Sequence, residues 1–155
     1  MTNSTQEAQN LMNGYGNTGL ELYGHSRGGM TLGNMLYSFK QKGVHGIADN
    51  TNINFYGSAF NALVASALLT YVSDGKQTTV GIDGYRYDFV SRWIGGNGYT
   101  YGTAPADNWW KETWKMFSDP RNAHTCLGSA DDVCTARYGS SHLEQVPSSK
   151  SWSKK

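Results

Sequence analysis

A chain of 155 residues is long enough for one domain with a hydrophobic core, and its formal net charge of +1 provides no strong field for binding nucleic acid or an anionic membrane. Its 19 glycines and 10 tyrosines against 3 prolines are typical of an ordered, aromatic-rich domain with many tight turns rather than a disordered chain. No apolar run reaches the roughly 18 residues that span a bilayer, and residues 1–13 are too polar for a signal peptide. We therefore expect no transmembrane segment, and any export would depend on sequence outside this chain.

The first segments of the chain predict two helices with a strand between them. Residues 4–13 are expected to form a short helix and residues 18–24 a short strand. A longer helix is predicted over 27–42, because its apolar residues recur at the spacing of a single helix face, at Leu32, Met35, Leu36 and Phe39. We expect this face to be buried.

The following segments continue the alternation of strands and helices. Residues 51–57 and 77–83 are predicted strands. The alanine-containing segment 62–72 between them is a predicted helix that is apolar on nearly all sides and should be well buried. A further amphipathic helix is expected over 107–117, and we interpret its apolar stripe as core packing rather than the lining of an acyl pocket; the stripe consists of Trp110, Thr113, Trp114 and Phe117.

Three alternations of strand and helix favour an α/β fold, with a mostly parallel sheet, flanking helices and right-handed crossovers. The chain is expected to form a single domain over residues 1–146. The remaining residues, 147–155, are polar and are predicted to be a disordered tail.

The motif Gly24-His25-Ser26-Arg27-Gly28 has the pattern G-x-S-x-G and lies between the first predicted strand and the helix 27–42. In a nucleophile elbow, such a serine lies on a strained turn, so we expect Ser26 to have unusual backbone angles, with a positive φ, at the start of the helix. Side chains at positions 24 and 28 should collide with the neighbouring strand or helix. The backbone N–H of Arg27 would stabilise an oxyanion. Alternatively, Ser26 is only the N-cap of the helix.

A serine nucleophile needs a histidine as base and a carboxylate that orients the histidine. The usual chain order of serine, acid and histidine leaves His124 or His142 as the base and Asp88 or Asp83 as the acid. Each aspartate is equally a candidate turn residue, and each histidine a candidate surface residue. We favour His124, because it follows the last predicted helix after a short turn, whereas His142 lies close to the polar tail. His25 is expected to point away from the site.

Two cysteines, Cys126 and Cys134, lie close together in the sequence. They form either a loop-closing disulfide, in a protein that matures outside the cytoplasm, or two free thiols. A disulfide would fix the loop two residues from His124. Zinc is not expected, because a four-ligand site would need two more ligands at suitable spacing. We expect neither a metal nor a cofactor.

Four stretches of the chain together resemble a region of large bacterial haemagglutinin-type exoproteins, the filamentous-haemagglutinin and contact-dependent-inhibition adhesins of Gram-negative bacteria. The stretches are LELYGHSRGGMTLGN, TNINFYGSAFNA, DFVSRWIGGN and HTCLGSADDVC. The resemblance covers roughly residues 1–135. It implies an α/β-hydrolase-like fold in which Ser26, Asp88 and His124 are the triad. The fold would be partial or reduced, because several strands normally precede the elbow strand and one of their loops donates a second oxyanion N–H.

The resemblance also implies a secreted or cell-surface location, as part of a larger exoprotein. The expected function is that of an effector region with esterase- or lipase-like serine hydrolase activity on a small ester or a lipid. One alternative is a nuclease toxin with a metal-free site formed by Arg121, His124, Arg137 and His142, although the near-neutral charge disfavours a nucleic-acid substrate. Another is a non-catalytic hydrolase-like module for delivery or for binding an immunity protein.

Overall fold

The computed structural model describes residues 2–100, 109–129, 131–140 and 142–149. A four-stranded sheet of order β1-β2-β3-β4 lies at its centre and is formed by β1 (Leu20–His25), β2 (Thr51–Tyr56), β3 (Thr79–Asp83) and β4 (Glu144–Pro147). The first three strands are parallel, and β4 pairs antiparallel with β3. The protein therefore has an α/β fold with a mixed, mostly parallel sheet, in agreement with the sequence.

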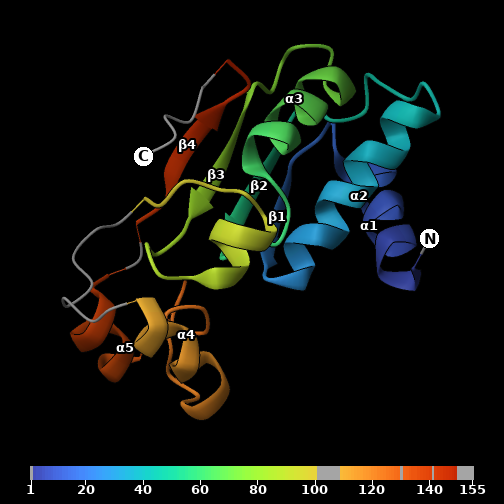
Figure 1. Ribbon diagram of the computed structural model, residues 1–155. Coiled ribbons are helices and arrows are strands. Elements are labelled where there is room, and N and C mark those ends of the chain that lie inside the picture. Colours follow the sequence, from blue (N-terminus) through green and yellow to red (C-terminus); the bar gives the residue numbers. More distant parts are fainter. Residues whose placement is uncertain (1, 101–108, 130, 141, 150–155) are drawn as a thin grey trace.

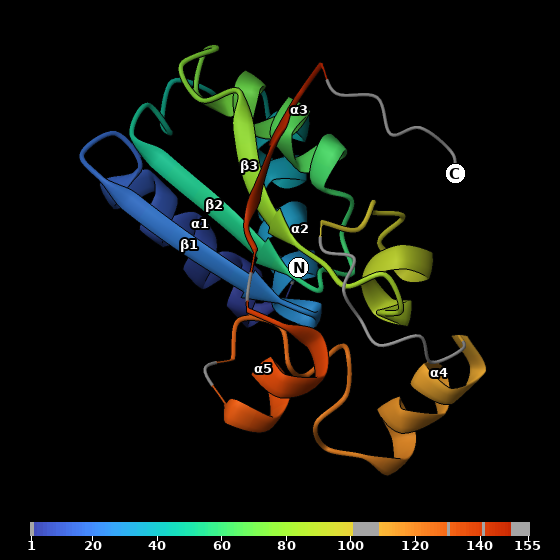
Figure 2. The same ribbon diagram turned by 90° about the vertical axis from the view of Figure 1, so that its left-hand side faces the viewer.

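Three helices cover one face of this sheet, as Figure 1 and Figure 2 show. They are α1 (Asn3–Tyr15), α2 (Arg27–Gln41) and α3 (Ala62–Val72). The parallel strands follow one another in chain order, so right-handed crossovers place α2 and α3 on the same side. The main hydrophobic core lies between these two layers and includes the fully buried Met35, Leu36, Phe55, Leu69 and Ile82.

The predicted helix and strand segments agree with the structure to within two residues at each end, and the apolar face of α2 is buried as expected. Residues 107–108 of the last predicted helix lie outside the described residues. The expectation that α3 is well buried holds for its inner side, which carries the buried Ala62, Ala65, Leu68, Leu69 and Val72. On the outer side, Val64 is 47% exposed and Tyr71 is 37% exposed. Only one layer of helices covers this face of the sheet, so the outer side of α3 faces solvent.

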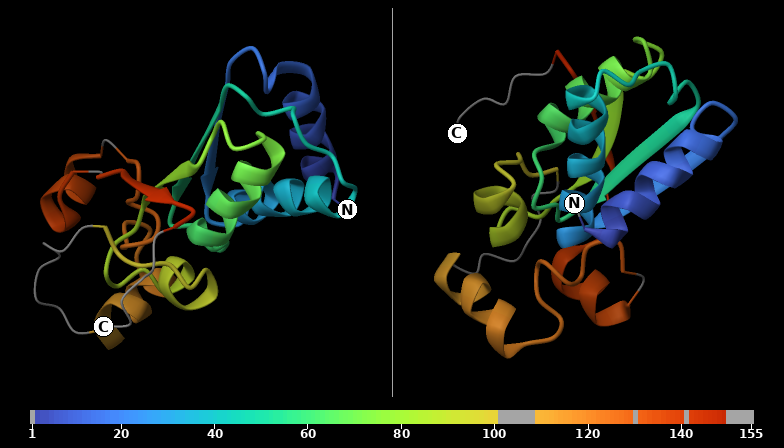
Figure 3. Two further views of the ribbon diagram at one scale, coloured as in Figure 1. Left: turned by 90° about the horizontal axis from the view of Figure 1, so that it is seen from above. Right: turned by 90° about the vertical axis from the view of Figure 1, so that its right-hand side faces the viewer.

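The chain after β3 forms a second group of elements beyond the carboxyl ends of the parallel strands (Figure 1, Figure 3). The group consists of a π-helical turn, η1 (Val90–Ile94), and the helices α4 (Trp109–Ser118) and α5 (Asp132–Tyr138). It has a small core of its own, formed by Tyr85, Ala123, Cys126, Leu127, Cys134 and Tyr138, with Tyr56 of β2 packed against it. The helix α5 and the strand β4 were not predicted.

The predicted boundary between domain and tail falls within a strand. Pro147, where the polar tail was expected to begin, is the last residue of β4 and pairs with Thr79. The N–H of Ser148 still donates to the carbonyl of Thr78 at 3.0 Å. Residues 150–155 of the predicted tail lie outside the described part of the chain.

The interpretation of the α4 stripe as core packing is wrong. Trp110, Trp114 and Phe117 are 78%, 72% and 83% exposed. The buried side of α4 carries Glu112, which accepts hydrogen bonds from the Tyr138 hydroxyl and the Lys115 ammonium, both at 2.8 Å. The sequence pattern identified an apolar face but did not show which face packs against the protein. In the part of the chain that the structure describes, no helix is long and apolar enough to cross a membrane.

Candidate active site

Ser26 lies on a strained turn between β1 and α2. Its φ of 53° and ψ of −118° place it in a region that residues other than glycine rarely adopt. The Ser26 N–H donates to the carbonyl of Tyr56 on β2, and its carbonyl accepts from the N–H groups of Gly29 and Ala59, at 3.1, 3.1 and 3.2 Å. The predicted positive φ at the start of the helix is confirmed. Ser26 is the N-cap residue of α2, but its hydroxyl makes no capping hydrogen bond, so the simple capping role does not account for it.

The glycines of the motif do not have equal roles. A Cβ atom at Gly24 would lie 2.8 Å from the Cα atom of Gly29, so β1 and α2 approach each other too closely for a side chain there. At Gly28, a Cβ atom would meet nothing within 4 Å, and the predicted collision is wrong for this position. The second tight position is Gly29, where a Cβ atom would overlap the Ser58 side chain.

Asp88 and His124 form a buried pair. His124 Nδ1 lies 3.0 Å from Asp88 Oδ1 and 3.1 Å from Asp88 Oδ2, and the two side chains are 11% and 0% exposed. Asp88 Oδ1 also accepts from the N–H groups of Val90 and Ser91, so the turn before η1 fixes the carboxylate. Because an ionised carboxylate only accepts, the hydrogen bond places the proton on His124 Nδ1 and leaves Nε2 as the basic atom.

Gly57 joins this pair to the serine turn. A Cβ atom at Gly57 would lie 2.6 Å from Asp88 Oδ2 and 3.0 Å from His124 Nδ1, so the pair packs directly on the backbone at the end of β2. The preceding residue, Tyr56, accepts the hydrogen bond from Ser26. Three segments that are distant in the sequence therefore meet around the carboxyl end of β2.

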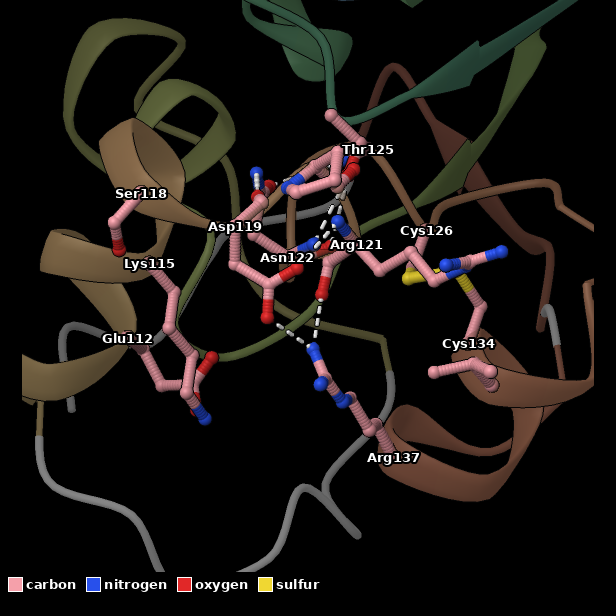
Figure 4. Close-up of polar contacts among 12 residues, drawn as sticks. Glu112, Lys115, Ser118, Asp119, Arg121, Asn122, Thr125, Cys126, Cys134 and Arg137 are labelled. Carbon is pink, nitrogen blue, oxygen red and sulfur yellow. Dashed lines mark hydrogen bonds and ion pairs between the residues drawn. A yellow bond between two sulfur atoms is a disulfide. The ribbon is translucent and has the colours of Figure 1, made fainter.

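The loop that carries His124 is held by a polar network, shown in Figure 4. Asn122 Oδ1 accepts from the N–H groups of His124 and Thr125, both at 3.0 Å. Arg137 of α5 donates to the Asp119 carboxylate and to the carbonyl of Arg121. These contacts fix the backbone on both sides of the histidine.

A disulfide between Cys126 and Cys134 ties the same loop to α5 (Figure 4). Of the two alternatives left open by the sequence, the structure has the disulfide. The bond begins two residues after His124, as expected for a link that restrains this histidine.

His25 contacts His124, and the expectation that it points away from the site is wrong. His25 Nε2 lies 2.8 Å from the His124 carbonyl oxygen, and the ring centroids are 4.8 Å apart. A carbonyl only accepts, so His25 Nε2 donates. The two histidines are separated by 99 positions, and no sequence spacing links them.

The two alternative residues, Asp83 and His142, contact each other. Asp83 is fully buried at the end of β3, and its Oδ2 accepts from the backbone N–H of His142 at 3.0 Å. The Thr100 hydroxyl donates to Asp83 Oδ1 at 3.3 Å. Burial and the nearby Asp83 carboxylate raise the pKa of Tyr56. The structure thus pairs Asp88 with His124 and holds the backbone of His142 on Asp83.

The arginines of the nuclease alternative are both in ion pairs. Arg121 binds Asp131 at 3.1 Å, and Arg137 binds Asp119. Hydrogen bonds from the Arg121 side chain lower the pKa of Asp131. The pKa of Asp119 is lowered by the Arg121 backbone N–H and then by the Arg137 side chain. Within the described ranges, no three His, Cys, Asp or Glu side chains are grouped as metal ligands would be.

The predicted oxyanion donor, Arg27, is the first residue of α2. N–H groups in the first turn of a helix lack intrahelical acceptors, and this end of a helix favours negative charge. A groove of about 730 Å³ lies beside this turn, between the N-terminal ends of α1 and α2, and is lined in part by Thr5, Tyr23, Arg27, Gly28, Leu32 and Ala59.

No protein-family model matches the chain, and neither a curated protein nor a solved structure is significantly similar to it. The contacts described above are therefore the structural basis for inferring a function.

Proposed function

We propose that the protein is a serine hydrolase, esterase- or lipase-like, that acts on a small ester or a lipid. One observation carries the proposal: the strained turn of Ser26 and the buried Asp88–His124 pair meet around Gly57 at one edge of the sheet. The φ of 53° and ψ of −118° at Ser26 form a combination that residues other than glycine rarely adopt, and such strain gathers at functional sites.

The proposed roles combine the Asp88–His124 hydrogen bond with the usual mechanism of a serine triad. Ser26 Oγ attacks the ester carbonyl carbon, and its proton passes to His124 Nε2. Asp88 holds the imidazole by Nδ1 and stabilises the imidazolium that forms. The Arg27 N–H and the N-terminus of α2 stabilise the oxyanion. His124 then protonates the leaving alcohol, and the acyl group on Ser26 is released by water that has lost a proton to His124.

The groove beside α2 is the proposed substrate-binding region. Arg27 and Gly28, which line it, follow the nucleophile directly, and Ala59 donates its N–H to the Ser26 carbonyl. Its lining combines threonine hydroxyls with apolar side chains such as Leu32. A small or medium ester suits such a mixed surface.

We further propose an α/β-hydrolase-like fold of partial or reduced form. The order of serine turn after β1, acid after β3 and histidine further on supports it. The antiparallel β4, which follows the histidine, is a departure from that pattern. From the resemblance to haemagglutinin-type exoproteins we also propose that the chain belongs to a secreted or cell-surface effector and that an immunity protein is its partner. The disulfide is consistent with an oxidising location.

Two alternatives remain as proposals of lower rank. The nuclease reading is weakened because Arg121 and Arg137 are already paired with carboxylates. A non-catalytic module accounts for the fold but does not explain the backbone strain at Ser26.

Labelling with a fluorophosphonate tests the proposal. Intact mass should show one adduct, peptide mapping should place it on Ser26, and Ser26→Ala should abolish it. A folded protein that takes no label contradicts the hydrolase. Degradation of added RNA or DNA by the Ser26→Ala variant would favour the nuclease instead.

A further inference from the structure

The outer side of α4 carries three large apolar side chains that the fold leaves uncovered. Trp110, Trp114 and Phe117 are at i, i+4 and i+7, so they lie on one stripe. Each is more than 70% exposed. The opposite side of α4 is anchored by Glu112, so rotation of the helix cannot bury the stripe without breaking the hydrogen bond to Tyr138 of α5.

A cluster of neighbouring aromatic rings connects α4 to η1. The ring centroids of Trp93 and Trp109 are 5.7 Å apart, and Phe89 lies 6.4 Å from Trp93 and 6.1 Å from Trp109. Trp93 is 70% exposed and its neighbour Ile94 is 55% exposed. We call Trp93, Ile94, Trp110, Trp114 and Phe117 the aromatic surface.

The exposed charge beside the aromatic surface is basic. Arg86 and Arg92 precede Trp93, and the exposed Arg86 and the half-buried Arg92 both lie over the ring of Tyr99. The acidic residue of segment 85–94 is Asp88, which is buried against His124. Arg86 and Arg92 therefore give this side of the aromatic surface an excess of positive charge.

We propose that the aromatic surface docks the protein on an anionic phospholipid membrane. Tryptophan is favoured at the boundary between lipid and water, since its large ring is apolar and its N–H remains hydrated. A membrane suits an exposed, tryptophan-rich surface, and its anionic headgroups complement Arg86 and Arg92. The docking does not depend on the proposed hydrolysis. If the substrate is a lipid, docking would bring the proposed active site to its substrate.

Vesicle co-sedimentation of the full chain tests the docking. Vesicles of phosphatidylcholine with phosphatidylserine should bind the protein, and vesicles of phosphatidylcholine alone should bind it less. The variant W110S/W114S/F117S should bind anionic vesicles at least about tenfold more weakly. The variant R86Q/R92Q should lose about fivefold for each charge removed. The matched control is Tyr15→Ser with Tyr37→Ser, which removes two exposed aromatic rings from α1 and α2 and should leave binding unchanged.

Failure of docking and failure of hydrolysis have different signatures. Ser26→Ala should bind vesicles as the wild type does, whether or not the protein takes a fluorophosphonate label. The docking proposal is overturned if the folded wild type ignores anionic vesicles, or if the triple variant, folded by circular dichroism, still binds them. It is also overturned if sedimentation shows self-association that the triple variant abolishes while vesicles bind neither protein; the aromatic surface is then an interface between copies of the chain.

Discussion

The ring of His25 lies against the ring of His124, and His25 Nε2 donates to the His124 carbonyl oxygen at 2.8 Å. His25 immediately precedes Ser26 at the end of β1. The strand that presents the proposed nucleophile therefore also holds the backbone of the proposed base. This makes His25 a positioning residue.

Removing that contact should slow catalysis without weakening substrate binding. A hydrogen bond of this kind is worth about 1 kcal/mol, so His25→Ala should lower kcat by about five- to tenfold and leave KM nearly unchanged. His25→Gln keeps a donor and should recover part of the loss. A rise in KM with unchanged kcat, or no recovery with glutamine, would assign His25 to the substrate or to general stability.

The contact of Gly57 with the Asp88–His124 pair predicts a position that tolerates no side chain. Gly57→Ala adds the strain of a positive φ, about 1 kcal/mol, and about 1–3 kcal/mol of overpacking against the pair. Activity should fall at least about a hundredfold as the pair is displaced.

Gly43→Ala is the matched control, because Gly43 has a φ of 67° and a Cβ atom there would meet nothing within 4 Å. It should show only the strain, in urea unfolding, with activity retained. Equal effects of the two substitutions would show that Gly57 does not support the site.

The two candidate histidines are separated by a paired substitution. His124→Ala should match Ser26→Ala, with ester hydrolysis reduced by about a thousandfold or more, because the members of a triad act as a unit. His142→Ala should cost much less activity, since His124 is the histidine that forms the buried pair with Asp88. The opposite result would transfer the base to His142 and the acid to Asp83. If Ser26→Ala, His124→Ala and His142→Ala all leave ester hydrolysis unchanged, the non-catalytic module is favoured.

The order of the helices and strands could be predicted from local sequence. The contacts of the site residues could be predicted only in part. The apolar spacing of α2 predicted the helix, and the G-x-S-x-G motif before it predicted the strain at Ser26. Both predictions were possible because strand, turn and helix are adjacent in the chain. Asp88 and His124 were chosen by chain order. Nothing local indicated that His25 would reach a carbonyl 99 positions away, or that the Trp110 side of α4 faces solvent.

Acid should destabilise the His124 loop. The pKa values of Asp119 and Asp131 are lowered in the folded protein, so their ionised forms stabilise it above the ordinary aspartate value of 3.8. That stabilisation is lost as the pH falls below 3.8 and through the lowered values. Urea unfolding between pH 5 and about pH 2 should show a smaller fall in midpoint for D119N/D131N than for wild type. A parallel fall would show that these ion pairs do not contribute.

Reduction of the Cys126–Cys134 disulfide should lower the free energy of unfolding by about 2–3 kcal/mol, from the entropy of a loop of this length. Activity should fall more than the content of sheet and helix, because the restraint begins two residues from His124. Dithiothreitol, followed by parallel assays of hydrolysis and far-UV circular dichroism, checks this. C126S/C134S should behave like the reduced protein, which separates the loss of the bond from other effects of the reagent.

The two hydrophobic clusters of the protein carry different parts of the proposed machinery. Ser26 directly precedes α2, whose buried apolar residues belong to the large cluster, whereas His124 lies between Ala123 and Cys126 of the small cluster. Segments with fewer buried contacts open more often than the rest of a protein, so the small cluster should exchange its amide hydrogens first. Opening of the small cluster then limits how long the active state lasts. On warming, hydrolysis should be lost while most backbone amides of the protein remain protected from exchange.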